Sequence, residues 1–430
     1  MNEKLLQYIW QYQLFNKQYL QTVDEFPLSI IHPGSANLNQ GPDFLNGKIK
    51  ISDTIWVGNI ELHVHSTDWN LHRHSDDCNY NNVILHVVWN HDKDIHLPFQ
   101  TLEMKSLVPK LLLDKYNGLM NNHLFIPCEK SIGYVNQIII KKYKERLLIE
   151  RLQERSCQIE SLLMTSKSNW IEVLWRMLAK NMGGKVNGEA FQQIAQHTPI
   201  KILLKHTHSL FQIEAILMGQ GGLLNQVHTD LYPRQLFKEY VFLQKKYSFI
   251  SPKVSVHFLR MRPPNFPTIR LSQLAALVQV FPLLMSNIIE TEDIKCVKSL
   301  LSIVSDKYWT THYVFDELSE EMLKKLGVQT IDSIIINTIV VLLYSYGYYN
   351  NIEHLQTKAI RWLEEISAEK NNICNTFEKL RIENKSAFDS QALLQLKSKY
   401  CDAKRCLDCA IGISVIKQNN STNITTNGKW

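Results

Sequence analysis

The fold of the first part of this chain is decided by residues 41–65, which read GPDFLNGKIKISDTIWVGNIELHVH. Two strand-like stretches, residues 44–51 and 54–65, flank a short turn at Ser52 and Asp53, and this pattern predicts a β-hairpin. Cross-strand partners in a hairpin lie only ~5 Å apart. We therefore expect Asp43 to lie beside Glu61, Leu62 or His63.

The hairpin also predicts which side chains share a face. Side chains alternate along a strand, so Glu61, His63 and His65 point to one side of the sheet, and an even register adds Asp43 to it. Two adjacent carboxylates repel each other unless a cation lies between them. We predict that Asp43 and Glu61 bind Mg²⁺ or Mn²⁺, while the imidazoles would favour Mn²⁺ or Zn²⁺. The alternative is that Asp43 caps a turn and Glu61 is a solvated strand residue.

Histidines are crowded around this hairpin. Of the sixteen in the chain, seven lie between His63 and His96. Imidazole serves as a metal ligand and as a general base, and a connection after Asp68 and Trp69 could fold back over the acids. Each histidine taken alone also fits a structural or solvated role. The residues that we predict to orient the metal ligands, or to bind the metal in their place, are His65, Asp68, His72 and His74.

The remaining sequence shows a strand-like pattern first and a helical pattern after it. Short strand-like stretches continue to Pro109, and a helix is predicted ahead of them over residues 3–15. After Pro109 the apolar spacing is helical. We predict an α+β protein with a sheet-containing domain over residues 1–110, a larger all-α domain over residues 111–415 and a flexible tail over residues 416–430. Helices are expected, for example, at residues 137–163, 170–181, 200–217, 271–284 and 332–346.

Composition narrows the class of protein. The 430 residues are 45% hydrophobic and 20% charged, which excludes disordered and fibrous proteins. The net charge of +6 permits an anionic partner without requiring one. The first residues do not show the pattern of a signal peptide, and the most apolar run, residues 334–343, is too short to cross a bilayer. We expect a soluble, cytoplasmic protein without a membrane partner, in an oligomeric state that stays open.

Three cysteines lie close together near the end of the chain, at positions 401, 406 and 409. Thiolates at this spacing can hold zinc, and Cys-x4-Cys-x2-Cys is also an iron–sulfur spacing when a distant cysteine completes it. Cys128 is our first choice for the fourth ligand of a zinc or iron–sulfur site, and Cys374 is the second. The alternative is that Cys406 and Cys409 are small apolar residues on the buried side of a final helix.

A second basic feature lies in the helical part. Arg260, Arg262 and Arg270 surround a rigid, proline-rich loop that carries Phe266. Guanidinium groups beside an aromatic ring suit contacts with a nucleic-acid backbone or with a stacked base. A buried loop would have the same composition.

The order of these elements resembles the core of the PD-(D/E)XK nuclease-like superfamily. The resemblance rests on Pro42-Asp43 before one strand, on Glu61-Leu62-His63 in the next, and on the later strand at residues 83–89. It implies a restriction-endonuclease-like mixed sheet with flanking helices. It also implies that Asp43 and Glu61 hold a divalent metal with help from the Leu62 carbonyl. His63 stands where that superfamily has a lysine that helps to activate water.

The whole chain also resembles an uncharacterised bacterial family of domains of unknown function. That resemblance rests on Gly41-Pro42-Asp43-Phe44, on the strand residues 60–64, on Asp68-Trp69 with His72 and His74, and on the terminal cysteines.

Three functional hypotheses follow. The leading one is a metal-dependent phosphodiesterase acting on DNA or RNA, with Asp43, Glu61 and His63 as catalytic residues. The others are a catalytically inactive nuclease-like scaffold that binds nucleic acid or protein, and a zinc-dependent hydrolase that uses His63, His65 and His72 or His74 with Glu61 as base.

Overall fold

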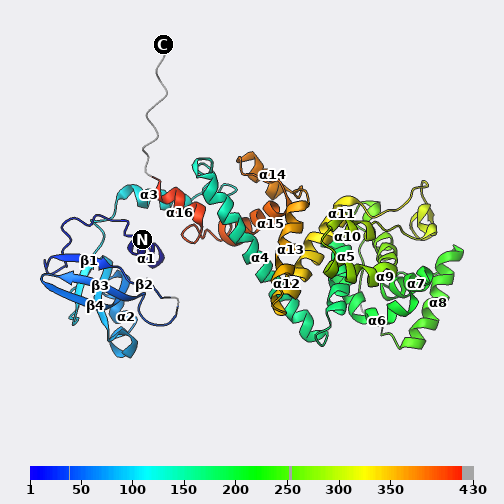
Figure 1. The fold of residues 1–430 in the computed structure, drawn as a ribbon, viewed down its shortest axis with the longest axis horizontal. Helices are drawn as coiled ribbons and strands as arrows, with labels where there is room; N and C mark the ends of the chain where they lie inside the picture. The colour runs from blue at the N-terminus through cyan, green and yellow to red at the C-terminus, as the bar shows by residue number, and fades with distance from the viewer. Residues whose placement is uncertain (38, 251–253, 419–430) are drawn as a thin grey trace, which may run out of the picture. The chain divides into compact units, whose positions relative to one another are not determined.

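A computed structural model describes residues 1–37, 39–250 and 254–418 of the chain (Figure 1). The chain divides into two compact units. Residues 1–143, together with the chain from residue 396 onward, form the first unit, and residues 144–395 form the second. The predicted sheet-containing domain lies within the first unit, and the predicted helical domain has residues in both. The predicted tail falls, from residue 419 on, outside the described residues.

The first unit is built on a mixed sheet of six strands, which confirms the predicted α+β class. The strand order is β1-β3-β4-β5-β6, and β2 pairs with β3. Pairing is antiparallel among β1, β2, β3 and β4, and parallel from β4 to β5 and from β5 to β6. The strands are β1 (Leu28–His32), β2 (Ser35–Ala36), β3 (Phe44–Ile51), β4 (Thr54–His65), β5 (Val83–Asn90) and β6 (Gln100–Glu103).

The second half of β4 is an interior strand. Ile60 and Leu62 are buried on one face, and Glu61 and His63 are buried on the other. Its parallel neighbour β5 is buried over residues 83–88, as expected for strands that are covered on both faces. The polar side chains of β4 therefore lie inside the unit.

Helix α1 (Glu3–Gln11) contacts strand β4. The Asn2 side chain caps its start by accepting a hydrogen bond from the Leu5 N–H at 2.9 Å. Leu6, Ile9 and Trp10 are among its buried residues, so its apolar face supplies core to this unit. The other α-helices that lie wholly in this unit are α2 (Asp68–Leu71), α3 (Lys110–Met120) and α16 (Ala410–Lys417).

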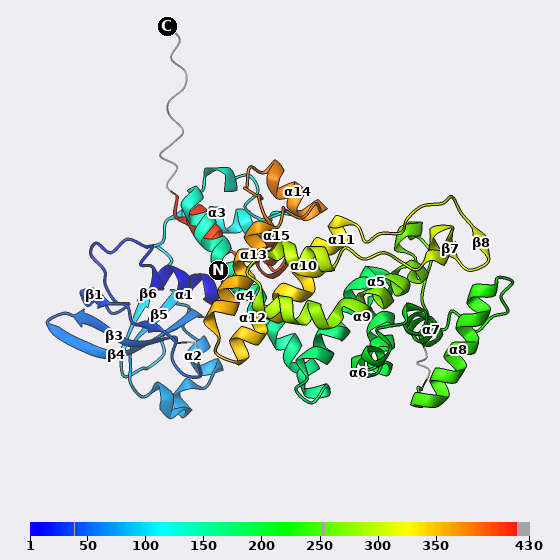
Figure 2. The same cartoon turned by 45° about the vertical axis from the view of Figure 1, so that its right-hand side comes forward.

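The second unit is helical apart from one small β-ribbon (Figure 2). The predicted helix over residues 200–217 is divided, because Ser209 caps the start of a new helix. A π-helical segment, Ile335–Ile339, joins α11 to α12. The elements are α4 (Gln137–Thr165, which begins before the unit boundary), α5 (Trp170–His197), α6 (Ile200–Leu203), α7 (Leu210–Gln220), α8 (Leu231–Tyr247), α9 (Pro267–Glu290), α10 (Ile294–Leu300), β7 (His312–Val314), β8 (Glu317–Leu318), α11 (Val328–Ile334), α12 (Val340–Tyr349), α13 (Glu353–Glu365), α14 (Asn372–Lys379) and α15 (Ala387–Gln395).

By length and composition alone, two helical stretches of this unit are long and apolar enough to cross a membrane: residues 267–290 and 328–349. Of the most apolar 18-residue segment of each stretch, 56% and 67% are buried, as is common for helices in the core of a protein. The predicted apolar run at residues 334–343 thus belongs to a longer helical stretch. Core helices of many proteins have the same length and apolarity, so these two stretches do not by themselves indicate a membrane protein.

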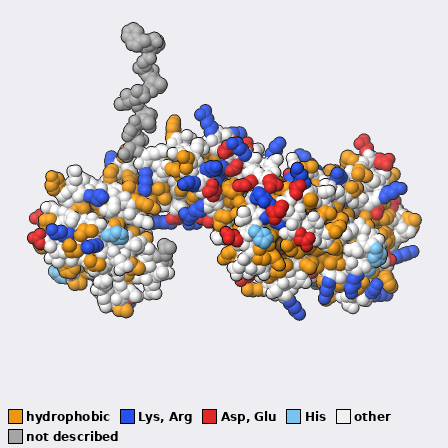
Figure 3. Space-filling model, in the orientation of Figure 1, with side chains coloured by type: hydrophobic (Ala, Val, Ile, Leu, Met, Phe, Trp, Pro, Cys, Tyr) orange, Lys and Arg blue, Asp and Glu red, His pale blue; other side chains and the backbone are white. Residues whose placement is uncertain are grey.

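Charge is mixed on the surface of the second unit. On the face drawn in Figure 3, acidic and basic side chains lie side by side over its helices. That face carries no continuous basic track of the kind that binds a long nucleic-acid backbone.

Candidate metal centre

A β-bulge in the hairpin brings Asp43 to the side of Glu61. Near the turn, Gly47 pairs with Gly58, but Phe44 pairs with Ile60, so the register shifts by one residue between these pairs. Asn46 lies in the bulge with a positive φ of 57°, and its N–H donates to Asn59 Oδ1 at 3.3 Å. Without this shift Asp43 would share a face with Leu62. The predicted convergence of Asp43 and Glu61 is confirmed.

The two carboxylates are held by hydrogen bonds from the backbone and from α1. Glu61 Oε2 accepts the Asp43 N–H at 3.0 Å, and Asp43 Oδ2 accepts the Leu62 N–H at 3.1 Å. Asp43 Oδ1 accepts the Gln7 side-chain amide at 2.7 Å. Burial, followed by the neighbouring charge of Asp43, raises the pKa of Glu61 well above its usual range. Both Asp43 oxygens have donors, whereas Glu61 Oε1 faces a group of histidines.

Two histidines, His63 and His74, lie beside that oxygen, and a third, His72, lies beside His63. His63 Nε2 lies 3.2 Å from His72 Nδ1 and 3.2 Å from His74 Nε2. Glu61 Oε1 lies 3.6 Å from His63 Nε2 and 3.4 Å from His74 Nε2. Among the described residues, these three histidines are the group of potential ligands whose donor atoms all lie within 4.8 Å of one another. We call Glu61, His63, His72 and His74 the histidine site.

The connection after β4 positions two members of this site. His72 follows α2, and His74 opens a short 3₁₀ turn, with Arg73 between them in the left-handed region at φ 57°. Trp69 is buried beneath this connection, and its indole N–H donates to Ser75 Oγ at 2.9 Å. The Trp69 ring packs edge-on against His74 at 5.2 Å between ring centroids. The predicted folding back of this connection over the acids is confirmed.

The protonation of the histidines suits metal binding. Burial lowers the pKa of His63 to about 2, with the neighbouring His86 as the next cause, and burial also lowers the pKa of His74. These rings are therefore neutral at pH 7, and a neutral imidazole nitrogen carries the lone pair that a metal needs.

His86, on β5, fixes the orientation of His63. The two rings are joined by a 2.8 Å contact from His63 Nδ1 to His86 Nε2, so one of these nitrogens carries the proton. If His63 donates it, His63 Nε2 is left free to bind a metal. An outer residue of this kind commonly orients a ligating histidine. The sequence suggested no such role for His86, although Glu61 and His86 are partners in the parallel ladder.

Part of the spacing of the donor atoms suits a tetrahedral ion. Zinc binds nitrogen and oxygen at about 2.0–2.2 Å, which puts the corners of a tetrahedron roughly 3.3–3.6 Å apart. The separations of His63 Nε2 from the other two imidazole nitrogens, and of Glu61 Oε1 from His63 and His74, are 3.2–3.6 Å, although Glu61 is not in the group whose donor atoms all lie within 4.8 Å of one another. Mg²⁺ would prefer a shell of oxygens. The residues present fit zinc or manganese better than magnesium.

The other predicted residues of this region lie outside the donor set. Leu62 uses its N–H to hold Asp43. His65 is exposed, and its N–H donates to the Asp68 carboxylate at 2.8 Å, so these two residues close the end of β4. One residue that sequence reasoning missed is Tyr80, whose ring stacks on His74 with a centroid distance of 3.9 Å. No spacing in the sequence signals this contact.

The remaining candidates lie in two other places. Cys128, Cys401, Cys406 and Cys409 belong to the first unit, and all are buried and free of disulfide bonds. Cys374, the second choice for a fourth ligand, belongs to the second unit. In the second unit, one cavity is lined by Arg260, Arg262 and Arg270.

Comparison with known proteins identifies a family, but the description of that family names no activity. Residues 3–372 match a family model whose description is "Protein of unknown function (DUF2851)". No curated protein and no solved structure matches the chain.

Proposed function

Because the chain belongs to this DUF2851 family, for which no function is described, we propose its function from the geometry of the histidine site. We propose a metal-dependent hydrolase that cleaves phosphodiester bonds of DNA or RNA, with Zn²⁺ or Mn²⁺ as the cation. The observation that carries the proposal is the grouping of three imidazole nitrogens, two of which lie within 3.6 Å of Glu61 Oε1. The phosphodiester substrate rests on the resemblance of the hairpin and its acids to the PD-(D/E)XK core.

Each residue of the site has a separate task in this proposal. Glu61, His63, His72 and His74 hold the cation, which supplies a Lewis acid and lowers the pKa of bound water. His86 holds the proton arrangement of His63 through the 2.8 Å contact. The Asp43 carboxylate accepts the Leu62 N–H and the Gln7 amide, and these contacts place its backbone N–H against Glu61 Oε2. Asp43 is thus a positioning residue here rather than the direct ligand that the sequence predicted.

The second candidate function is a nuclease-like scaffold without catalysis. The burial of the site favours this candidate. Glu61 is 5% exposed and His63 is 1% exposed, so a substrate would reach a metal held there only from the side of His72. His63 in place of the lysine of the PD-(D/E)XK pattern favours it too. The two candidates differ in whether bound metal supports cleavage.

A pair of histidine variants tests the proposal. His72 is exposed, so His72→Ala should fold normally while removing one ligand. We expect metal-dependent cleavage of single- and double-stranded DNA and RNA to fall by at least ~10–100-fold, because loss of even an outer-shell partner has that effect. His65→Ala is the matched control, since His65 is an exposed histidine outside the donor set.

Cleavage is measured with labelled oligonucleotides and Zn²⁺, Mn²⁺ or Mg²⁺, and metal content by mass spectrometry. A wild-type protein that binds metal at the histidine site but cleaves no nucleic acid would be the scaffold instead. Equal activity of the His72 and His65 variants would remove the site from the mechanism.

A further inference from the structure

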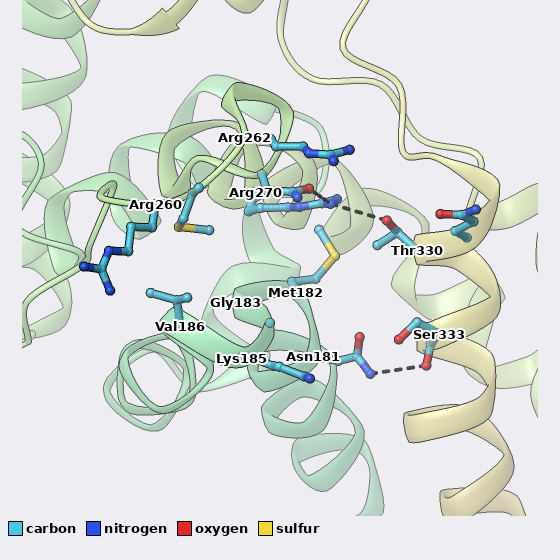
Figure 4. Close-up of a pocket in the computed structure, with 14 residues that line it drawn as sticks. Asn181, Met182, Gly183, Lys185, Val186, Arg260, Arg262, Arg270, Thr330 and Ser333 are labelled. Carbon is cyan, nitrogen blue, oxygen red and sulfur yellow. Dashed lines mark hydrogen bonds between the residues drawn. The ribbon is translucent and has the colours of Figure 1, made fainter. Parts of the chain in front are cut away.

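The second unit contains a cavity of about 450 Å³ (Figure 4). Its walls come from α5 near residues 181–186, from the loop at residues 260–265, from the start of α9 and from α11. Helix α5 is broken at Gly184, whose φ of 61° and ψ of −155° are not helical, and the break forms part of the wall. The volume lies within the range of sites that bind small molecules, about 300–1,000 Å³.

All the charged residues that line this cavity are basic. Lys185, Arg260, Arg262 and Arg270 line it, and no aspartate or glutamate does. Among the residues that the structure describes, none of these four cations has a carboxylate partner at ion-pair distance. Other basic residues of the unit are paired, such as Lys298 with Asp332 at 2.8 Å. Unpaired cations around one cavity repel each other and attract an anion.

Arg270 is held in place for such a role by neutral groups. Its Nη1 donates to Gln273 Oε1 at 3.0 Å, and its Nη2 donates to Asn265 Oδ1 at 2.5 Å and to Thr330 Oγ1 at 3.3 Å. A guanidinium that is fixed but not neutralised loses little freedom when it binds a phosphate. Burial lowers the pKa of Arg270, as expected for a cation without an anionic partner.

Charged and apolar side chains both line the cavity. In Figure 4, Arg262 and Arg270 lie above Met182, Lys185 lies on the opposite wall, and Arg260 points away from both. Met182, Val186 and Met261 supply apolar lining. This combination suits a ligand with a phosphate at one end and a ring system at the other.

We propose that this cavity binds a phosphate-bearing ligand of mononucleotide size, with the phosphate contacted by Arg262 and Arg270. The phosphate can belong to a free nucleotide or to the phosphorylated end of a nucleic acid. The proposal is independent of the hydrolase proposal, because it concerns other residues in the other compact unit.

The test measures ligand binding to the full chain by calorimetry. The probes are AMP, adenosine, inorganic phosphate, and a trinucleotide with and without a 5′-phosphate. We expect AMP to bind and adenosine to fail. We also expect the exposed Arg262→Gln variant to weaken AMP binding by about 10-fold or more, because a charge-assisted contact is lost. Arg234→Gln, an exposed arginine of α8 outside the cavity, is the matched control and should bind AMP like wild type.

Binding of the phosphorylated trinucleotide without binding of AMP would support the site and identify a nucleic-acid end as its ligand. Equal binding of AMP and adenosine would overturn the proposal. It would also be overturned by failure of every phosphorylated probe at millimolar concentration, or by unchanged affinity in Arg262→Gln. None of these results depends on nuclease activity.

Discussion

Replacing Glu61 with glutamine is expected to remove most of the stabilisation that zinc should give to this protein. A ligand present at 100 times its dissociation constant stabilises a fold by about 2.7 kcal/mol. If the variant binds zinc ~100-fold more weakly, the same concentration supplies only about 0.4 kcal/mol. Thermal unfolding with and without zinc measures the difference, and metal-dependent nucleic-acid cleavage should be lost with it.

The same substitution separates a ligand from a structural carboxylate. Glu61 is 5% exposed and lies beside Asp43, so its charge without a cation is unfavourable. Metal-free Glu61→Gln should therefore unfold no more easily than metal-free wild type. Asp53→Asn, at the exposed hairpin turn, is the control and should keep the full response to zinc. A large loss of stability in the metal-free Gln variant, with the zinc response intact, would contradict the assignment.

The second large effect is expected at Lys358, in the core of the second unit. Lys358 is 2% exposed, and its ammonium donates to the Ile289 carbonyl at 2.8 Å and to the Thr291 carbonyl at 3.0 Å. These carbonyls end helix α9, where a cation is favourable. Lys358→Ala leaves both without a donor and opens space beside Trp362. We expect the free energy of unfolding to fall by about 3 kcal/mol, measured in urea.

A companion variant tells hydrogen bonding from packing. Lys358→Met keeps an unbranched apolar chain against Trp362 but cannot donate, so it should lose a large part of the same stability. Lys379→Ala, an exposed lysine of α14, should change stability by less than about 0.5 kcal/mol. Wild-type stability in Lys358→Met would show that the two carbonyls do not need the ammonium.

Local patterns were sufficient for the hairpin and for one pair of site residues. The predicted strands, residues 44–51 and 54–65, are the strands β3 and β4, because alternating apolar residues and a two-residue turn act over a short distance. The turn predicted that Asp43 lies beside Glu61, Leu62 or His63, but it did not decide among these three registers. The bulge at Asn46 selects one of them, and Asn46-Gly47 is a pair of residue types that favours such a bulge, although the pair alone does not fix the register.

The parts that could not be predicted depend on contacts between distant segments. His86 approaches His63 because β5 pairs in parallel with β4, and a parallel partner is not signalled by a turn. The exposed position of His65 was missed, since the alternation of faces says nothing of where burial ends along β4. Likewise, the loop at Arg260 was recognised by its composition, but its opposite wall at Lys185 comes from another helix.

Because His72 is the exposed member of an otherwise enclosed set of donors, it stands at the entrance of the histidine site. A chelator would reach the proposed ion only past this ring. The lifetime of an ion held there would then depend on how often the connection between β4 and β5 opens, and not only on the strength of the ligands.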